Sequence, residues 1–163
     1  MLFEREIQLN EFLISYLKLL MKGIGDDILF KGQLDGVNSP GWCLGHLATE
    51  GDKALNVIGI ARSSPESWDN LFLMKATGID DKTIFPKKSE LTAAVSETYQ
   101  KLRSAAANFD EAFIGAECPS QFLKPVLPTQ GLLFAHMLTT HVAMHAGNIA
   151  AWRRTHGFGP LLG

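Results

Sequence analysis

Two histidines stand four residues apart in the segment THVAMHAGNIAAWRR, residues 140–154. On a helix this spacing places His141 and His145 one turn apart on the same face, where two imidazoles can share a divalent metal ion. The residue after His141 is Val142, so the segment lacks the glutamate that acts as general base in zinc metalloprotease helices. The spacing alone leaves two interpretations open: a pair of metal ligands, or two core histidines bonded to protein groups.

A third histidine, His46, lies in the segment SPGWCLGHLATE, residues 39–50, on a mostly apolar stretch. Three protein ligands that leave one coordination position free are typical of a catalytic divalent metal site. Three neutral imidazoles suit zinc, nickel or cobalt better than magnesium or calcium. The sequence therefore offers His46, His141 and His145 as a candidate metal site, with zinc or nickel as the expected metal.

Two neighbours of His46 could take part in the same chemistry. Glu50 lies one helical turn beyond His46, where it could be a fourth ligand, an acceptor for a histidine N–H, the general base, or a solvated carboxylate. Cys43 could supply a thiolate, although a buried cysteine packed as a small hydrophobic residue is the favoured interpretation. Trp42 and Trp152 could wall the site or pack in the core.

Four amphipathic segments must position these residues. Apolar residues recur at helical spacing over residues 2–22, and a second helix begins with Ser39 as N-cap and Pro40 at its first position and runs to about Gly59. A third helix is capped by Ser89, and the last runs from Thr129, its N-cap, to about His156. Residues 60–88 are irregular apart from a short helix near residue 67, and suit a crossover that makes the second and third helices parallel.

The last helix carries the histidine pair on its apolar face. At about 100° per residue, His141 and His145 share a side with Phe134, Leu138 and Trp152, and Asn148 lies beside them. His136 is expected to face away from this side. His156, at the end of the helix, is expected to act as a C-terminal charge or capping partner.

The bulk composition sets limits on the class of protein. The chain has 163 residues, a net charge of -2 and 46% hydrophobic residues, which fits one all-α domain spanning residues 1–163. Because no basic stripe with aromatic residues is present, nucleic-acid binding is not expected. The two cysteines are too few for a disulfide framework, and neither a signal peptide nor a membrane span is recognised. A soluble, cytoplasmic protein that does not bind membranes is expected.

The two histidine segments together resemble the DinB/YfiT-like superfamily, through GHLATE in the second helix and THVAMHAGNIAAWRR in the last. The resemblance implies a four-helix bundle with a long crossover between helices two and three, and a metal held by His46, His141 and His145. Gly147 matches the family glycine, Asn148 stands where the family usually has Gln, and two arginines fit the basic end of the motif.

The flanking polar residues of this motif have two interpretations each. Asn148 could bond a ligand or substrate, or satisfy its own helix. Arg153 and Arg154 are more typical of a solvated helix end, but an arginine turned toward the metal would favour an anionic substrate. We therefore predict Glu50 as the catalytic residue, and Asn148 and Arg153 as substrate-binding residues.

The resemblance also implies function. Some members are thiol-dependent S-transferases or isomerases, others are assigned as metal-dependent hydrolases, and homodimers are common. The leading hypothesis is a metal-dependent transferase or hydrolase acting on a small molecule, with a low-molecular-weight thiol as candidate. The alternatives are a non-catalytic metal-binding or stress-response bundle, its site closed by Glu50 or Cys43, and a metal-free bundle that dimerises through an apolar helix face.

Overall fold

The computed structural model describes residues 1–31, 38–72, 84–159 and 161, and within these the chain is helical. The long helices are α1 (Glu4–Leu20), α2 (Pro40–Val57), α4 (Lys88–Ala106), α6 (Gln130–Leu138) and α7 (Thr140–Thr155). Shorter pieces are η1 (Glu66–Trp68), α3 (Asp69–Phe72) and α5 (Glu111–Gly115). The extended pairing seen in the described residues is an isolated bridge between Glu117 and Thr129. The predicted all-α class is confirmed.

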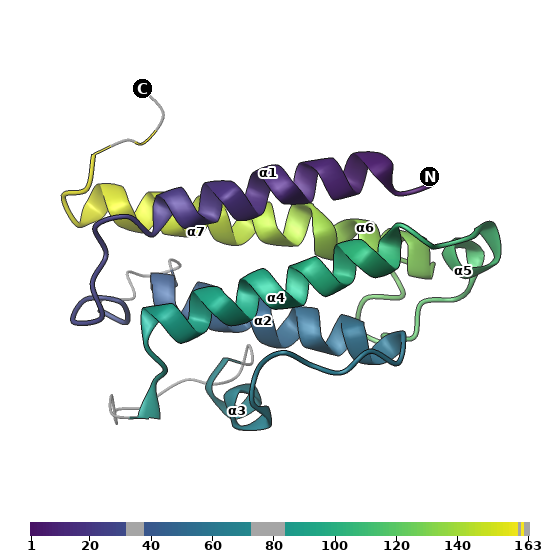
Figure 1. Cartoon of the computed structure of the whole chain (residues 1–163), viewed down its shortest axis with the longest axis horizontal. Coiled ribbons are helices and arrows are strands. Elements are labelled where there is room, and N and C mark those ends of the chain that lie inside the picture. The colour runs from purple at the N-terminus through teal and green to yellow at the C-terminus, as the bar shows by residue number, and fades with distance from the viewer. Residues whose placement is uncertain (32–37, 73–83, 160, 162–163) are drawn as a thin grey trace.

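The long helices lie side by side, with α2 and α4 running in the same direction and α1 and α7 in the other (Figure 1). This parallel pair is what the predicted crossover requires. The connection from α2 to α4 includes η1 and α3, which lie where a short helix near residue 67 is predicted. The part of the predicted crossover at residues 73–83 lies outside the described residues.

Two of the predicted helix starts are confirmed by their caps. The Ser39 hydroxyl accepts a hydrogen bond from the Trp42 N–H at 3.3 Å, with Pro40 at the first helical position. The Thr129 hydroxyl accepts from the Leu132 N–H at 3.3 Å and begins α6. Both hydroxyls satisfy backbone donors that a helix start leaves unpaired.

The predicted Ser89 cap of the third helix is wrong, because α4 already begins at Lys88. The Lys88 N–H donates to Asp26, in the loop after α1, at 2.7 Å, and the Lys87 N–H donates to Glu90 at 2.8 Å. Carboxylates near a helix N-terminus are favoured by its dipole. The local carboxylate of Glu90 and a carboxylate from a distant loop together place this helix start, and a local sequence pattern reveals only the first.

The predicted single helix from Thr129 to His156 is broken at Thr139, whose backbone angles are φ -122 and ψ -80. The Thr139 hydroxyl donates to the Ala135 carbonyl at 2.6 Å, a back-bond that bends helices. At about 100° per residue, the buried residues of α6 and those of α7 centre about 80° apart around a straight helix. A continuous helix could not turn both faces to the core, and the break corrects the mismatch.

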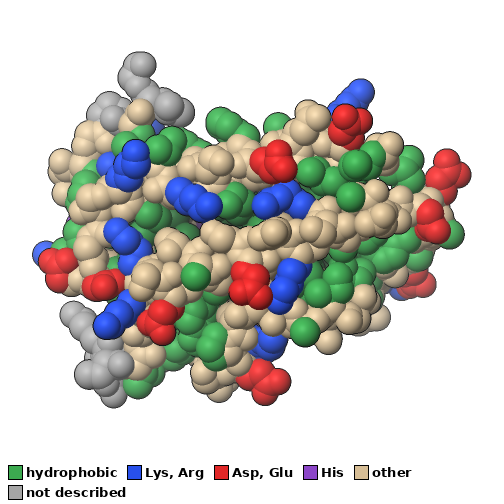
Figure 2. Space-filling view, in the orientation of Figure 1, with side chains coloured by type: hydrophobic (Ala, Val, Ile, Leu, Met, Phe, Trp, Pro, Cys, Tyr) green, Lys and Arg blue, Asp and Glu red, His purple; other side chains and the backbone are tan. Residues whose placement is uncertain are grey.

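The surface carries charges of both signs. Lys and Arg side chains are interspersed with Asp and Glu over the face that Figure 2 shows. Among the described residues, no helix combines the length and apolar character needed to cross a membrane.

Two helical glycines provide a matched test of this packing. A Cβ on Gly45, in α2, would lie 2.5 Å from the Phe72 ring, whereas a Cβ on Gly147, in α7, would meet nothing within 4 Å. We expect Gly45→Ala to lower the free energy of unfolding by about 1–3 kcal/mol through overpacking. Gly147→Ala should raise it by about 0.5–1 kcal/mol through helix propensity. Urea unfolding followed by circular dichroism checks both, and equal effects of the two substitutions would contradict the packing described.

Candidate metal centre

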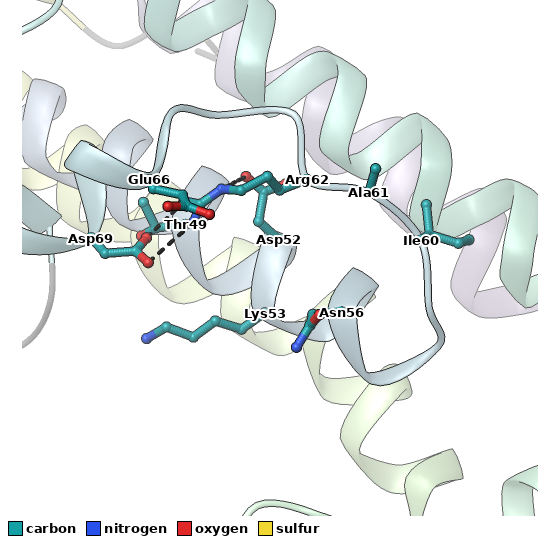
Figure 3. Close-up of a pocket in the computed structure, with 9 residues that line it drawn as sticks. All are labelled: Thr49, Asp52, Lys53, Asn56, Ile60, Ala61, Arg62, Glu66 and Asp69. Atoms are coloured by element: carbon teal, nitrogen blue, oxygen red, sulfur yellow. Dashed lines mark hydrogen bonds and ion pairs between the residues drawn. The ribbon is translucent and has the colours of Figure 1, made fainter.

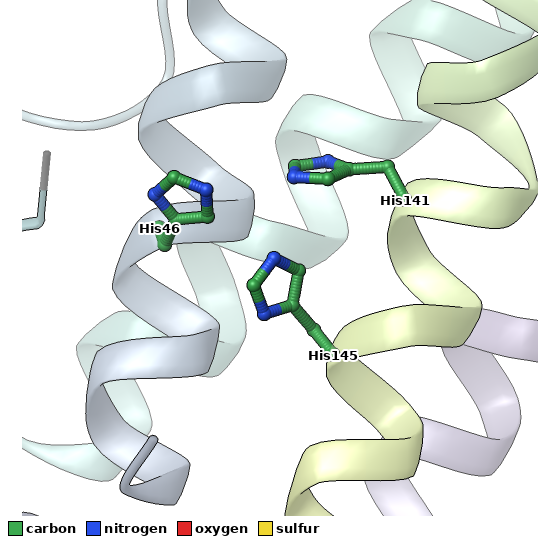
Figure 4. A group of neighbouring side chains, drawn as sticks. All are labelled: His46, His141 and His145. Carbon is green, nitrogen blue, oxygen red and sulfur yellow. The ribbon is translucent and has the colours of Figure 1, made fainter. Parts of the chain in front are cut away.

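Three histidines from two helices meet inside the bundle. His46 extends from α2, and His141 and His145 from α7, with their rings turned toward one another (Figure 4). One ligand atom from each lies within 4.8 Å of the others, and the ring centroids are 4.8 to 5.4 Å apart. The side chains are 5%, 9% and 7% exposed. The structure thus brings together the three predicted ligands in a group that could hold a metal ion.

His46 is held by contacts on two sides of its ring. Its Nδ1 lies 2.7 Å from the Phe72 carbonyl oxygen. Because a carbonyl only accepts, Nδ1 carries the hydrogen and Nε2 keeps its lone pair. Trp42 stacks on the ring with centroids 4.6 Å apart and an interplanar angle of 11°. A metal-ligating histidine is usually oriented by such a hydrogen bond from its other nitrogen.

His141 and His145 have buried nitrogens without protein partners. The Nδ1 atom of each is buried and has no hydrogen-bond partner among the residues that the structure describes. Such a group costs about 1–3 kcal/mol when it is left unpaired. The interpretation of two core histidines satisfied by protein groups therefore does not describe this pair, and a bound ligand or ion fits it better.

The surroundings keep all three imidazoles neutral. Burial, together with a smaller contribution from the neighbouring histidines, lowers the pKa of His141 to about 2 and that of His145 to about 4. Burial also lowers the pKa of His46, although the hydrogen bond to Phe72 opposes this. Metal ligation requires neutral imidazole, so the site is in the binding-competent state at neutral pH.

Neither Glu50 nor Cys43, the open candidates for an additional ligand, belongs to the close group of three histidines. Glu50 is half-buried and pairs with Lys53, with 2.5 Å between the carboxylate oxygen and the ammonium nitrogen. Its charge still raises the pKa of His46, so the carboxylate acts on the site electrostatically. Cys43 is fully buried, and burial raises the pKa of its thiol to about 12. Cys43 is thus buried as the favoured interpretation expects, packed as a small hydrophobic residue.

Arg153, predicted to bind substrate, contacts the end of α1 in the structure. Its guanidinium is buried, and Nη1 donates to the carbonyl oxygens of Leu20 and Lys22 at 2.7 Å each. The guanidinium also lies over the Phe158 ring, 4.9 Å from its centroid. Arg153 thus pairs the carbonyls that the C-terminal end of α1 leaves free.

Arg154 and Asn148 complete the motif on α7. Arg154 is exposed, as expected of a helix end. Asn148 is half-buried, and its contact with a ligand or substrate stays a prediction.

His136 does not face away from the site, contrary to prediction. Its ring centroid lies 5.4 Å from that of His141, and its Nδ1 lies 2.6 Å from the Thr140 hydroxyl. The prediction carried a uniform helical rotation through Thr139, where the helix breaks. The sequence feature that could have indicated the break is the angular difference between the apolar faces before and after Thr139.

Trp152 and His156, near the C-terminal end of α7, stabilise that end of the helix. The His156 Nδ1 lies 2.9 Å from the Trp152 carbonyl oxygen, which confirms the capping role. Trp152 is fully buried, donates from its indole nitrogen to the Lys31 carbonyl at 2.9 Å, and stacks on His156. Trp42 therefore walls the histidine group, whereas Trp152 packs elsewhere.

Tyr99, on α4, is a residue that the sequence pattern placed only in the core. Its side chain is fully buried, and its hydroxyl has no partner among the described residues. Burial raises the pKa of this hydroxyl, and the negative charge of Glu50 contributes to the increase.

A separate cleft of about 300 Å³ lies between α2 and the segment that follows it (Figure 3). None of the three histidines lines it. Arg62 pairs with Asp69 at 2.8 Å, and the Asp52 carboxylate accepts from the N–H groups of Ser63 and Ser64 at 2.9 Å each. These contacts hold the chain after α2 in place.

The chain matches one protein family over a region that contains the histidine group. The sequence profile of the DinB superfamily matches residues 11–149, which include all three histidines. A search of curated proteins finds no match.

The buried neutral histidines predict acid sensitivity of the metal-free protein. Unfolded histidines take up protons near pH 6.5, whereas His141 and His145 do so only near pH 2 and 4, so the unfolded state binds more protons and stability falls as the pH falls. From pH 7.5 to 5 we expect a loss on the order of 2 kcal/mol for each of the two. Urea unfolding in EDTA measures it, and His141→Leu should lose roughly 2 kcal/mol less than wild type. An equal loss in both proteins would show that His141 titrates normally.

Proposed function

The chain belongs to the DinB superfamily, and from this membership and its three-histidine group we propose that it is a metal-dependent enzyme of the S-transferase or hydrolase kind. The observation that carries the proposal is the convergence of three buried, neutral imidazoles, two of which have a nitrogen without a hydrogen-bond partner in the described part of the chain. His46, His141 and His145 would hold the ion.

Zinc or nickel is the proposed metal, since an all-imidazole set suits borderline transition metals rather than magnesium or calcium. Such an ion, when bound, polarises a substrate and lowers the pKa of a water or thiol at its free coordination position. The chain itself orients His46 through the Phe72 carbonyl and Trp42. Glu50, one turn from His46, is the proposed proton carrier, because its carboxylate is half-buried and close enough to influence the histidine.

The ligand set favours an enzyme over a closed structural site. Structural zinc sites have four protein ligands, and catalytic sites leave a position for water or substrate. Among the described residues the close group contains three histidines and no fourth ligand. Cys43 holds its proton tightly, and Glu50 pairs with Lys53. The substrate is proposed to be a small molecule, with a low-molecular-weight thiol as candidate, while the homodimer and cytoplasmic location stay predictions.

Metal content is the first test. Protein purified without a His tag should carry about one equivalent of zinc or nickel per chain by elemental mass spectrometry. His46→Ala and His141→Ala should lose it, because two imidazoles bind far more weakly than three. His156→Ala is the matched control, since His156 caps the far end of α7 and should leave the metal content unchanged. Wild-type protein that takes up no divalent metal would refute the proposal.

The free coordination position is tested with cobalt as a spectroscopic probe. Adding glutathione or 2-mercaptoethanol to the cobalt-loaded protein should produce a thiolate-to-cobalt absorption band in the near ultraviolet. The band should be absent from His46→Ala treated in the same way. A cobalt spectrum that neither thiol nor azide alters would indicate a closed site and favour the non-catalytic alternative.

A further inference from the structure

Asn10 is a polar residue on the buried face of α1, and it is 0% exposed. Its side-chain amide is satisfied at both ends. The Nδ2 group donates to the Leu138 carbonyl at 2.6 Å, and Oδ1 accepts from Nη1 of Arg103, on α4, at 2.7 Å. A buried, fully bonded amide thus links α1, α4 and α6.

The carbonyl that Asn10 binds belongs to the last residue of α6. Leu138 directly precedes Thr139, where the helix breaks before α7. The last carbonyls of a helix lack partners within the helix, and leaving one buried and unpaired is unfavourable. The Asn10 amide supplies the partner from a neighbouring helix, and therefore favours the broken arrangement over a continuous helix.

The break controls where the next residues point. His141 follows it by two positions, and the buried faces of α6 and α7 would be about 80° out of phase without it. A straight helix packed through α6 would turn α7 by about this angle, and His141 and His145 would then approach His46 in a different orientation. The distances among the three rings therefore depend on a kink that lies outside the histidine group.

We propose that Asn10 is a positioning residue for the candidate metal centre, which fixes the break at Thr139 through the Leu138 carbonyl and so aims His141 and His145 at His46. This inference rests on the proposed metal binding. A merely structural Asn10 would stabilise the bundle without any particular effect on the histidines.

The decisive substitution is Asn10→Asp at pH 7.5. Aspartate has nearly the same size and keeps the acceptor for Arg103, but it removes the donor to the Leu138 carbonyl. Thr98→Val is the matched control, because Thr98 is also fully buried and its hydroxyl donates to Asp52 at 3.0 Å, in a different network. Both variants lose one buried hydrogen bond.

Zinc affinity, measured by competition with a chromophoric chelator, should fall roughly 10- to 100-fold in Asn10→Asp, the range seen when a group that orients metal ligands is lost. Thr98→Val should keep the wild-type affinity even where its thermal stability falls as much. An Asn10→Asp variant that is folded by circular dichroism and binds zinc like wild type would overturn the proposal. So would an equal loss of affinity in both variants.

A second readout does not depend on the metal. Imidazole ring resonances of the metal-free protein, followed by nuclear magnetic resonance, should shift for His141 and His145 in Asn10→Asp and stay in place for His156. If wild-type protein binds no metal but these shifts occur, the positioning role holds and the proposed function fails. If Asn10→Asp does not fold, Arg103→Gln replaces it, because Arg103 is at a half-exposed position. Arg103→Gln should shift the same His141 and His145 resonances by a smaller amount. The absence of these shifts would overturn the proposal.

Discussion

The C-terminal third of the bundle is governed by a mismatch between two apolar faces on one stretch of chain. The residues that α6 buries and those that α7 buries cannot both face the core along a straight helix, since they centre about 80° apart. The chain resolves this with non-helical backbone angles at Thr139, stabilised by the Thr139 hydroxyl and by Asn10. The direction of both histidines on α7, and the approach of His136 to His141, follow from this kink.

Without a ligand, the histidine group lowers the stability of the folded chain. Burial keeps the rings of His141 and His145 neutral, and their Nδ1 atoms have no partner among the described residues. A protein that gained only packing from these positions would do as well with apolar residues of similar volume. A site that holds unpaired lone pairs in a low-dielectric interior instead is prepared for a ligand, whose binding then contributes to folding stability.

The segment after α2 also shapes the site. Phe72, at the end of α3, accepts the hydrogen bond from His46, and its ring packs at the Cα of Gly45, where no larger residue fits. Packing and hydrogen bonding in this segment therefore fix the tautomer of a proposed metal ligand on the neighbouring helix.

The sequence by itself determined the helical class and the caps at Ser39 and Thr129, because each depends on neighbours within a turn or two along the chain. The grouping of the three histidines was indicated by the resemblance of two distant segments to one family. The sequence also indicated that Cys43 packs as a hydrophobic residue. Only the tertiary structure decided that Arg153 binds α1, that His136 approaches the site and that Asp26 caps α4. The break at Thr139 belongs to this second group, since it depends on a hydrogen bond between Asn10 and Leu138, which are 128 residues apart. Local periodicity carries no information about such partners, and they exist only once the helices have packed.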